Sequence, residues 1–220
     1  ITGVAHAYMD AIPLICIAGR SPIRDDDHLP LQGMDQVALM APITKFARTV
    51  LQPERIAEYL VMAWRQATSG RPGPVFLDIP IDVLFTPTSE AAVPKLSRHE
   101  PDRRSVPPAE AIDSALDLLE RAERPAIFAG GGAFFSGAQE ELRQFAAMTS
   151  VPVFANAKAR GIVPEWSRLG YGNFALASSP LATQAAGGPA DVVMLLGARV
   201  GMFTGTGPRS FIPPGAKVIQ

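Results

Sequence analysis

Short apolar runs alternate with amphipathic segments in the first 86 residues of the chain. The runs at 14–18 and 75–79 are continuous, which is typical of parallel strands buried on both faces. Between them, apolar residues recur at helical spacing from Ile56 to Ala67, after a proline at position 53 that suits a first helical turn. Shorter helices are predicted at 1–9 and 36–40.

The same alternation starts again after a segment rich in Pro, Ser, Arg and Glu. Helices are predicted at 108–121, 139–148 and 180–186, and strands at 126–129, 151–154, 191–196 and 217–219. Strands that alternate with helices indicate parallel sheets covered by helices. The fold class predicted is therefore α/β, with two open, doubly wound parallel-sheet domains at 1–86 and 106–220 and a linker at 87–105.

Composition excludes several classes of function. Hydrophobic residues make up 47% of the 220 residues and the net charge is −1, so the chain can fill a core and has no basic excess for nucleic acid. No apolar run approaches the ~20 residues of a membrane span. Cys16, the one cysteine, is expected to be a core residue, and a reducing cytoplasm fits it. Neither end resembles a natural terminus, which suggests a fragment.

Two turns that follow predicted strands are candidates for binding a phosphate group. Gly130-Gly131-Gly132 precedes a helix but matches neither the G-x-G-x-x-G nor the P-loop spacing, so a tight strand-to-helix turn is the favoured alternative. Gly197-Ala198-Arg199 ends another strand, and Arg199 could pair with a phosphate or simply be solvated.

Other polar residues give weaker signals. Gln32 lies in a loop, where a glutamine is usually solvated, although its amide could orient a carbonyl. The three histidines lack metal-ligand spacing, and the run Asp25-Asp26-Asp27 is expected to be a solvated loop, so no metal site is predicted.

A set of short motifs, taken in order, resembles one enzyme family. These motifs include Thr2-Gly3-Val4-Ala5, Leu31-Gln32, Ala41-Pro42-Ile43-Thr44-Lys45, Arg71-Pro72-Gly73-Pro74, Asp78-Ile79-Pro80 and Gly197-Ala198-Arg199. They are similar to the acetolactate synthase superfamily of thiamine-diphosphate enzymes. Within it, Arg24-Asp25-Asp26 and Asp35-Gln36-Val37-Ala38 most resemble the benzaldehyde lyases.

The resemblance implies part of a three-domain enzyme. It assigns residues 1–86 to the second half of the pyrimidine-binding domain and 106–220 to most of the central domain. It implies thiamine diphosphate and Mg²⁺ as cofactors of the full-length enzyme, with the diphosphate and metal motif beyond this chain, so the chain alone is expected to be inactive. The implied reaction is that of a lyase, carboligase or decarboxylase on 2-hydroxy ketones or 2-keto acids, with Gln32 in the catalytic site.

The resemblance leaves the flavin and the exact member open. Gly131, Gly132 and Arg199 match positions near the FAD of acetolactate synthases, but Val200-Gly201-Met202 replaces the acidic residues expected after the arginine. Acetolactate synthase, in branched-chain amino-acid synthesis, remains an alternative. A homodimer or homotetramer is implied. A non-catalytic binding or assembly module is the alternative of another class.

Overall fold

The computed structural model describes residues 1–31, 33–95, 106–164, 166–173, 187–201 and 212–220. The chain divides into two compact units, Ile1–Arg103 and Arg104–Gln220. Within its described residues, no helix is both long enough and apolar enough to cross a membrane.

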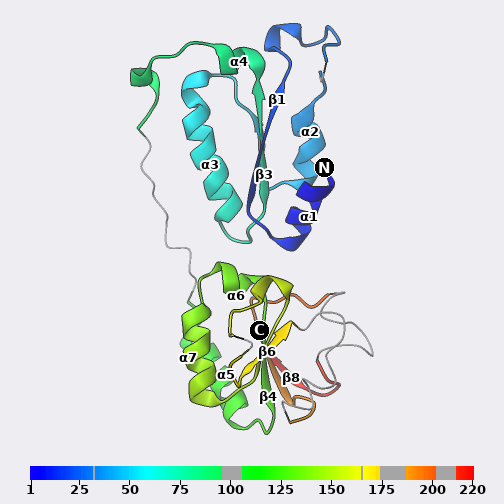
Figure 1. Ribbon diagram of the computed structural model, residues 1–220, viewed down its shortest axis with the longest axis vertical. Helices are drawn as coiled ribbons and strands as arrows, with labels where there is room; N and C mark the ends of the chain where they lie inside the picture. Colours follow the sequence, from blue (N-terminus) through cyan, green and yellow to red (C-terminus); the bar gives the residue numbers. More distant parts are fainter. Residues whose placement is uncertain (32, 96–105, 165, 174–186, 202–211) are drawn as a thin grey trace. The chain divides into compact units, whose positions relative to one another are not determined.

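Unit 1 is a parallel sheet between two layers of helices. Its elements are α1 (Thr2–Asp10), β1 (Leu14–Arg20), α2 (Gln36–Met40), β2 (Ala47–Thr49), α3 (Ile56–Thr68), β3 (Pro74–Pro80) and α4 (Ile81–Phe85), with 3-10 turns at Ile23–Asp25, Ala41–Ile43, Pro53–Arg55 and Glu90–Ala92. The strand order is β1-β3-β2. Figure 1 shows α3 on one face of the sheet and α1 and α2 on the other.

Strand β3 is the centre of unit 1, as its apolar run predicts. All seven of its residues are buried. Val75 and Leu77 pack with Ala63 of α3 on one face, and Phe76 packs with Met40 of α2 on the other. Burial of both faces therefore explains why the run is continuous rather than alternating.

Strand β1 differs from its prediction. It forms at the predicted place, but Leu14 is 38% exposed and Ile17 is 54% exposed, so the expectation of burial on both faces is wrong here. The reason is its position: β1 pairs with β3 along one edge and stands at the end of the three-stranded sheet. Cys16 is half-buried rather than a core residue.

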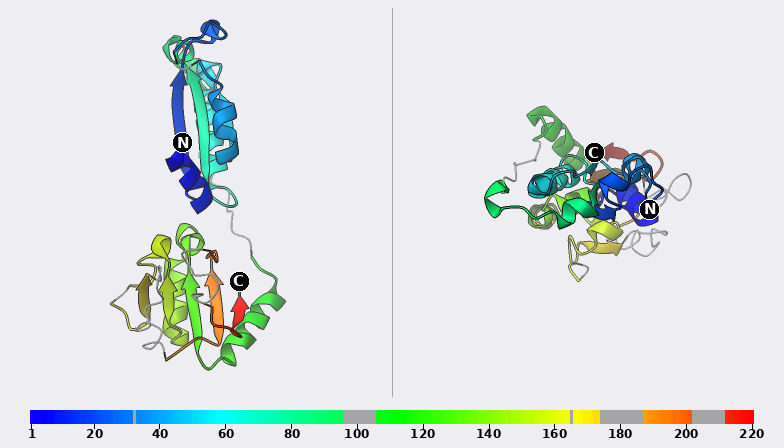
Figure 2. Two further views of the ribbon diagram at one scale, coloured as in Figure 1. Left: turned by 90° about the vertical axis from the view of Figure 1, so that its right-hand side faces the viewer. Right: turned by 90° about the horizontal axis from the view of Figure 1, so that it is seen from above.

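Unit 2 is a second parallel sheet. Its elements are α5 (Ala109–Glu120), β4 (Pro125–Ala129), α6 (Gly131–Phe135), α7 (Gln139–Thr149), β5 (Val153–Ala155), β6 (Gly170–Asn173), β7 (Val192–Leu196) and β8 (Lys217–Ile219), with a 3-10 turn at Ala157–Ala159. The order is β6-β5-β4-β7-β8, and every pairing is parallel. Figure 2 shows these strands side by side. The predicted α/β class with parallel sheets is confirmed.

The core of unit 2 lies on both faces of this sheet. Ile127 belongs to one buried cluster, together with Leu142 of α7, whereas its neighbour Phe128 packs with Val193 in the other. Helix α5 forms as predicted, but Ile112 and Leu116 on its apolar face each remain 42% exposed. The helix predicted at 180–186 lies outside the described residues. The predicted linker and domain boundaries remain predictions.

Candidate functional site

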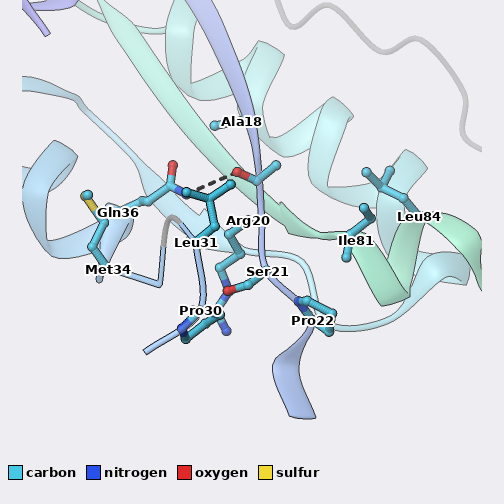
Figure 3. A pocket seen from close by; sticks show the side chains of 11 residues that line it. Ala18, Arg20, Ser21, Pro22, Pro30, Leu31, Met34, Gln36, Ile81 and Leu84 are labelled. Atoms are coloured by element: carbon cyan, nitrogen blue, oxygen red, sulfur yellow. Dashed lines mark hydrogen bonds between the residues drawn. The ribbon is translucent and has the colours of Figure 1, made fainter. Parts of the chain in front are cut away.

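Unit 1 contains an open pocket of about 760 Å³ where β1 and β3 end. Its lining comes from the last residues of β1, the turn after it, the segment before α2, and α4: Ala18, Gly19, Arg20, Ser21, Pro22, Pro30, Leu31, Met34, Gln36, Ile81 and Leu84. Figure 3 shows Ile81 and Leu84 on one side, and Met34, Leu31 and Gln36 on the other. The carboxyl ends of parallel strands are where open α/β sheets bind ligands.

Helix α2 is fixed against β1 by two side chains at its start. The Asp35 carboxylate accepts a hydrogen bond from the backbone N–H of Ala38 at 2.8 Å, which caps the helix. The Gln36 amide donates to the backbone oxygen of Gly19 at 3.1 Å. These bonds place Met34 and Gln36 beside the end of β1, so this wall of the pocket is anchored to the sheet.

A buried carboxylate, Asp78 of β3, lies close to the pocket residue Arg20. Asp78 is 1% exposed, and its Oδ2 accepts a hydrogen bond from the Thr49 hydroxyl at 3.1 Å. The same oxygen is 3.5 Å from Nε of Arg20, while Oδ1 has no partner among the residues that the structure describes. Burial raises the pKa of Asp78. Sequence analysis used Asp78 only as part of a family motif and not as a candidate functional residue, although an acidic residue inside the run Val75–Ile79 was a usable signal.

The raised pKa of Asp78 predicts a pH-dependent stability. The folded chain holds the proton of the Asp78 carboxyl more tightly than the unfolded chain does. The resulting contribution to the free energy of unfolding is therefore complete below the ordinary pKa of about 3.9 and is lost as the pH rises through the pKa of the folded chain. Asp78→Asn keeps the shape without the titration. We expect the free energy of unfolding of D78N to increase relative to that of the unmodified chain as the pH rises above about 4. Urea unfolding at several pH values measures this, and a constant difference would contradict it.

Gln32, the predicted catalytic residue, lies outside the described residues. Leu31 and Met34, close to it in sequence, do line the pocket. The role of Gln32 remains a prediction.

The structure brings together the two glycine turns of unit 2. The backbone N–H of Gly130 donates to Leu196 at 2.8 Å, and that of Gly132 donates to Gly197 at 2.9 Å. Strands β4 and β7 are neighbours, whereas the chain leaves β4 for β5 on its other side. This reversal is a topological switch point, a usual ligand position in such sheets. Arg199 follows the second turn directly.

Close packing of backbone explains two of these glycines without a ligand. A Cβ on Gly130 would lie 2.3 Å from the oxygen of Gly197, and one on Gly132 would lie 2.8 Å from its Cα. A Cβ on Gly131 would meet the Lys158 side chain, at 3.2 Å. The predicted nucleotide-binding role of Gly131, Gly132 and Arg199 stays a prediction.

No metal site emerges in the described part of the chain: no three His, Cys, Asp or Glu side chains are grouped so as to hold an ion. Two of the consecutive aspartates pair with arginines instead, Asp25 with Arg24 at 3.7 Å and Asp26 with Arg20 at 2.8 Å.

Comparison with known proteins identifies the family. Residues 112–220 match the family model described as "Thiamine pyrophosphate enzyme, central domain". The whole chain aligns at 34% identity, over 225 residues, with a "Probable acetolactate synthase large subunit" of Methanocaldococcus jannaschii. The chain belongs to the thiamine pyrophosphate enzyme family.

Two further relatives support this family assignment. Oxalyl-CoA decarboxylase of Escherichia coli K12 is 34% identical over 218 residues, which is 96% of the chain. The structure of a candidate thiamin diphosphate-dependent enzyme from Mycobacterium smegmatis superposes with a TM-score of 0.69 at 25% identity, over 98% of this chain and 41% of that one. The chain spans 37% of the length of the M. jannaschii and E. coli relatives. The predicted family and its thiamine diphosphate dependence are confirmed.

Proposed function

We propose that the protein containing this chain is a thiamine-diphosphate-dependent lyase, carboligase or decarboxylase that acts on 2-hydroxy ketones or 2-keto acids. The observation that carries this proposal is the alignment of nearly the whole chain with a synthase and a decarboxylase of the family. The pocket of unit 1 is then one wall of the active site.

The lining of the pocket suits a ring or another uncharged group. Leu31, Met34 and Ile81 present apolar side chains, and the only cation among the described lining residues, Arg20, is already paired with Asp26. Such a wall excludes water from a flat heterocycle or from an apolar substituent. Because its one cation is already paired, in this proposal the diphosphate and its Mg²⁺ are held by residues other than the pocket lining.

Thiamine diphosphate, when bound, supplies the electron sink for the bond that breaks. The part proposed for Gln32 is to donate a hydrogen bond from its side-chain amide to the oxygen of the reacting carbonyl. A neutral donor at that position stabilises the negative charge that develops on the oxygen. The pocket lining keeps the substrate in place and bulk water away.

The same proposal extends to flavin and assembly. The packing of Gly130 and Gly132 against Gly197 accounts for the glycine turns without a nucleotide, which favours an enzyme without FAD. The proposal includes a homodimer or homotetramer, since the pocket is open on one side. It also includes a cytoplasmic location, which a free thiol at Cys16 fits.

Acetolactate synthase is the second candidate. It is favoured by the alignment of all of this chain with 37% of the M. jannaschii protein. The two are separated by giving the purified full-length protein thiamine diphosphate and Mg²⁺ and then benzoin, benzoylformate or pyruvate in turn. Aldehyde release without bound flavin supports the lyase or decarboxylase. Acetolactate from pyruvate together with a flavin absorption spectrum supports the second candidate. No turnover of any of them, together with no binding of thiamine diphosphate, favours a non-catalytic module.

A further inference from the structure

The segment between β1 and Leu31 forms much of the pocket wall. Residues 21–31, here called the β1 loop, contribute Ser21, Pro22, Pro30 and Leu31 to the lining. The position of this loop therefore decides the shape of the pocket, and what holds the loop in place bears directly on the site.

Two residues of the β1 loop have backbone φ angles in the left-handed region. Asp27 has φ of 68° and Leu29 has φ of 51°, which is the left-handed region. An aspartate adopts that region with little cost, but a leucine rarely does. The Leu29 side chain is 95% exposed, so no packing of that side chain compensates. Backbone hydrogen bonds within the loop support residues 22–28, and contacts with the sheet and α4 add to them in holding the loop in place.

Two contacts connect the β1 loop to the sheet and to α4. The guanidinium of Arg20 donates to the Asp26 carboxylate at 2.8 Å, while its Nε lies 3.5 Å from the buried Asp78 of β3. Arg20 thus bridges a carboxylate in the sheet and a carboxylate in the loop. At the start of the loop, the backbone N–H of Ile23 donates to Asp82 at 3.0 Å.

The Arg20 bridge is partly shielded from water. The Arg20 side chain is 17% exposed and Asp78 is 1% exposed, whereas Asp26 is 43% exposed. Shielding strengthens the interaction of Arg20 with its partners relative to a solvated surface pair. By contrast, Arg24 in the same loop is 82% exposed and lies 3.7 Å from its partner Asp25. The Arg20 bridge is therefore the stronger candidate for fixing the loop.

We propose that Arg20 is a positioning residue of the active site: by bridging Asp78 and Asp26, it holds the β1 loop so that Pro22, Pro30 and Leu31 form the pocket wall. This inference rests on the proposed function for its effect on turnover. The effect on the loop itself is independent of any activity.

The test compares two adjacent isosteric substitutions in the full-length holoenzyme. Asp26→Asn removes the loop partner of Arg20, and Asp27→Asn removes the same charge from a residue that forms no ion pair with any described residue. We expect D26N to increase thermolysin cleavage at the His28–Leu29 bond about 5-fold, because a loosened loop opens more often. We expect it to lower kcat/KM about 10-fold, mainly through KM. D27N should change neither by more than about 2-fold.

A second set of variants separates positioning from general destabilisation. Arg20→Gln removes the cation beside the buried Asp78, which keeps only its hydrogen bond from Thr49, and is expected to lower stability, so its kcat/KM is compared with those of D26N and the R20Q/D26N double variant. The double variant should lose no more kcat/KM than R20Q alone, because both substitutions remove the same Arg20–Asp26 ion pair. Arg20→Lys should lower kcat/KM less than Arg20→Gln does, since lysine keeps the positive charge but not the several N–H donors of the guanidinium.

Three results would overturn the inference. The first is equal cleavage of D26N and D27N. The second is increased cleavage of D26N with unchanged kcat/KM, and the third is additive losses in the double variant. If the unmodified holoenzyme shows no turnover that depends on thiamine diphosphate, the proposed function fails instead, and the cleavage comparison still decides whether Arg20 holds the loop.

Discussion

Gln32→Ala lowers the turnover of the full-length enzyme about 100-fold, because it removes the donor proposed to stabilise the oxygen of the reacting carbonyl. The loss should appear in kcat and kcat/KM together, as expected for an interaction that is strongest in the transition state. Steady-state kinetics with saturating thiamine diphosphate and Mg²⁺ measures it. The melting temperature should change little if the loss is catalytic rather than structural.

A glutamine elsewhere in the chain provides the control for this loss. Gln144 on α7 is exposed, and its amide donates to Glu140 at 3.0 Å. Gln144→Ala should leave kcat and KM unchanged. If Gln32→Ala also retains full turnover, Gln32 is not part of the catalytic site, and the assignment based on the resemblance is wrong.

Gly130→Ala destabilises unit 2 by roughly 2–4 kcal/mol, a large effect for one methyl group. The added Cβ would lie 2.3 Å from the Gly197 oxygen and 2.4 Å from the Ala198 Cα, and both atoms belong to backbone that is held by β7. Relief requires the two turns to separate, which weakens the hydrogen bonds between them. Equilibrium unfolding in urea measures the change in free energy.

Gly131→Ala is the matched variant. Its Cβ would meet the Lys158 side chain at 3.2 Å, and that side chain can move. We expect a loss of less than about 1 kcal/mol, since helix α6 begins here and alanine suits a helix better than glycine. Equal losses for both variants would show that close packing does not explain the glycine at position 130. Loss of a bound nucleotide in both variants would instead support the predicted nucleotide site.

Strands that contain an apolar run could be predicted from the sequence, including the short β5 and β8, whereas two short strands without such a run could not. The run Val75–Ile79 corresponds to β3, and 191–196 contains β7. Ala47–Thr49 and Gly170–Asn173 were missed, because three or four residues with Arg, Thr, Gly or Asn carry no apolar run. Their strand conformation depends on pairing with β3 and β5. Tertiary contacts outweigh local preference in such elements.

Burial and ion pairs could be predicted from the sequence less well than the strands themselves. Leu14–Arg20 and Pro74–Pro80 carry similar apolar runs, yet β3 is fully buried and β1 is half-exposed, because only β3 has a neighbour on each edge. The bridge from Arg20 to Asp78 joins residues 58 positions apart, so no local pattern contains it. Only the pairing of β1 with β3 brings them together.

Thiamine diphosphate binding by the full-length protein tests the central claim most directly. The cofactor-free protein is titrated calorimetrically with thiamine diphosphate, once with Mg²⁺ and once with EDTA, and thiamine without its diphosphate serves as the control ligand. We predict saturable binding with Mg²⁺, at least about 100-fold weaker binding with EDTA, and no detectable binding of thiamine. Absence of thiamine diphosphate binding in the presence of Mg²⁺ would contradict the account.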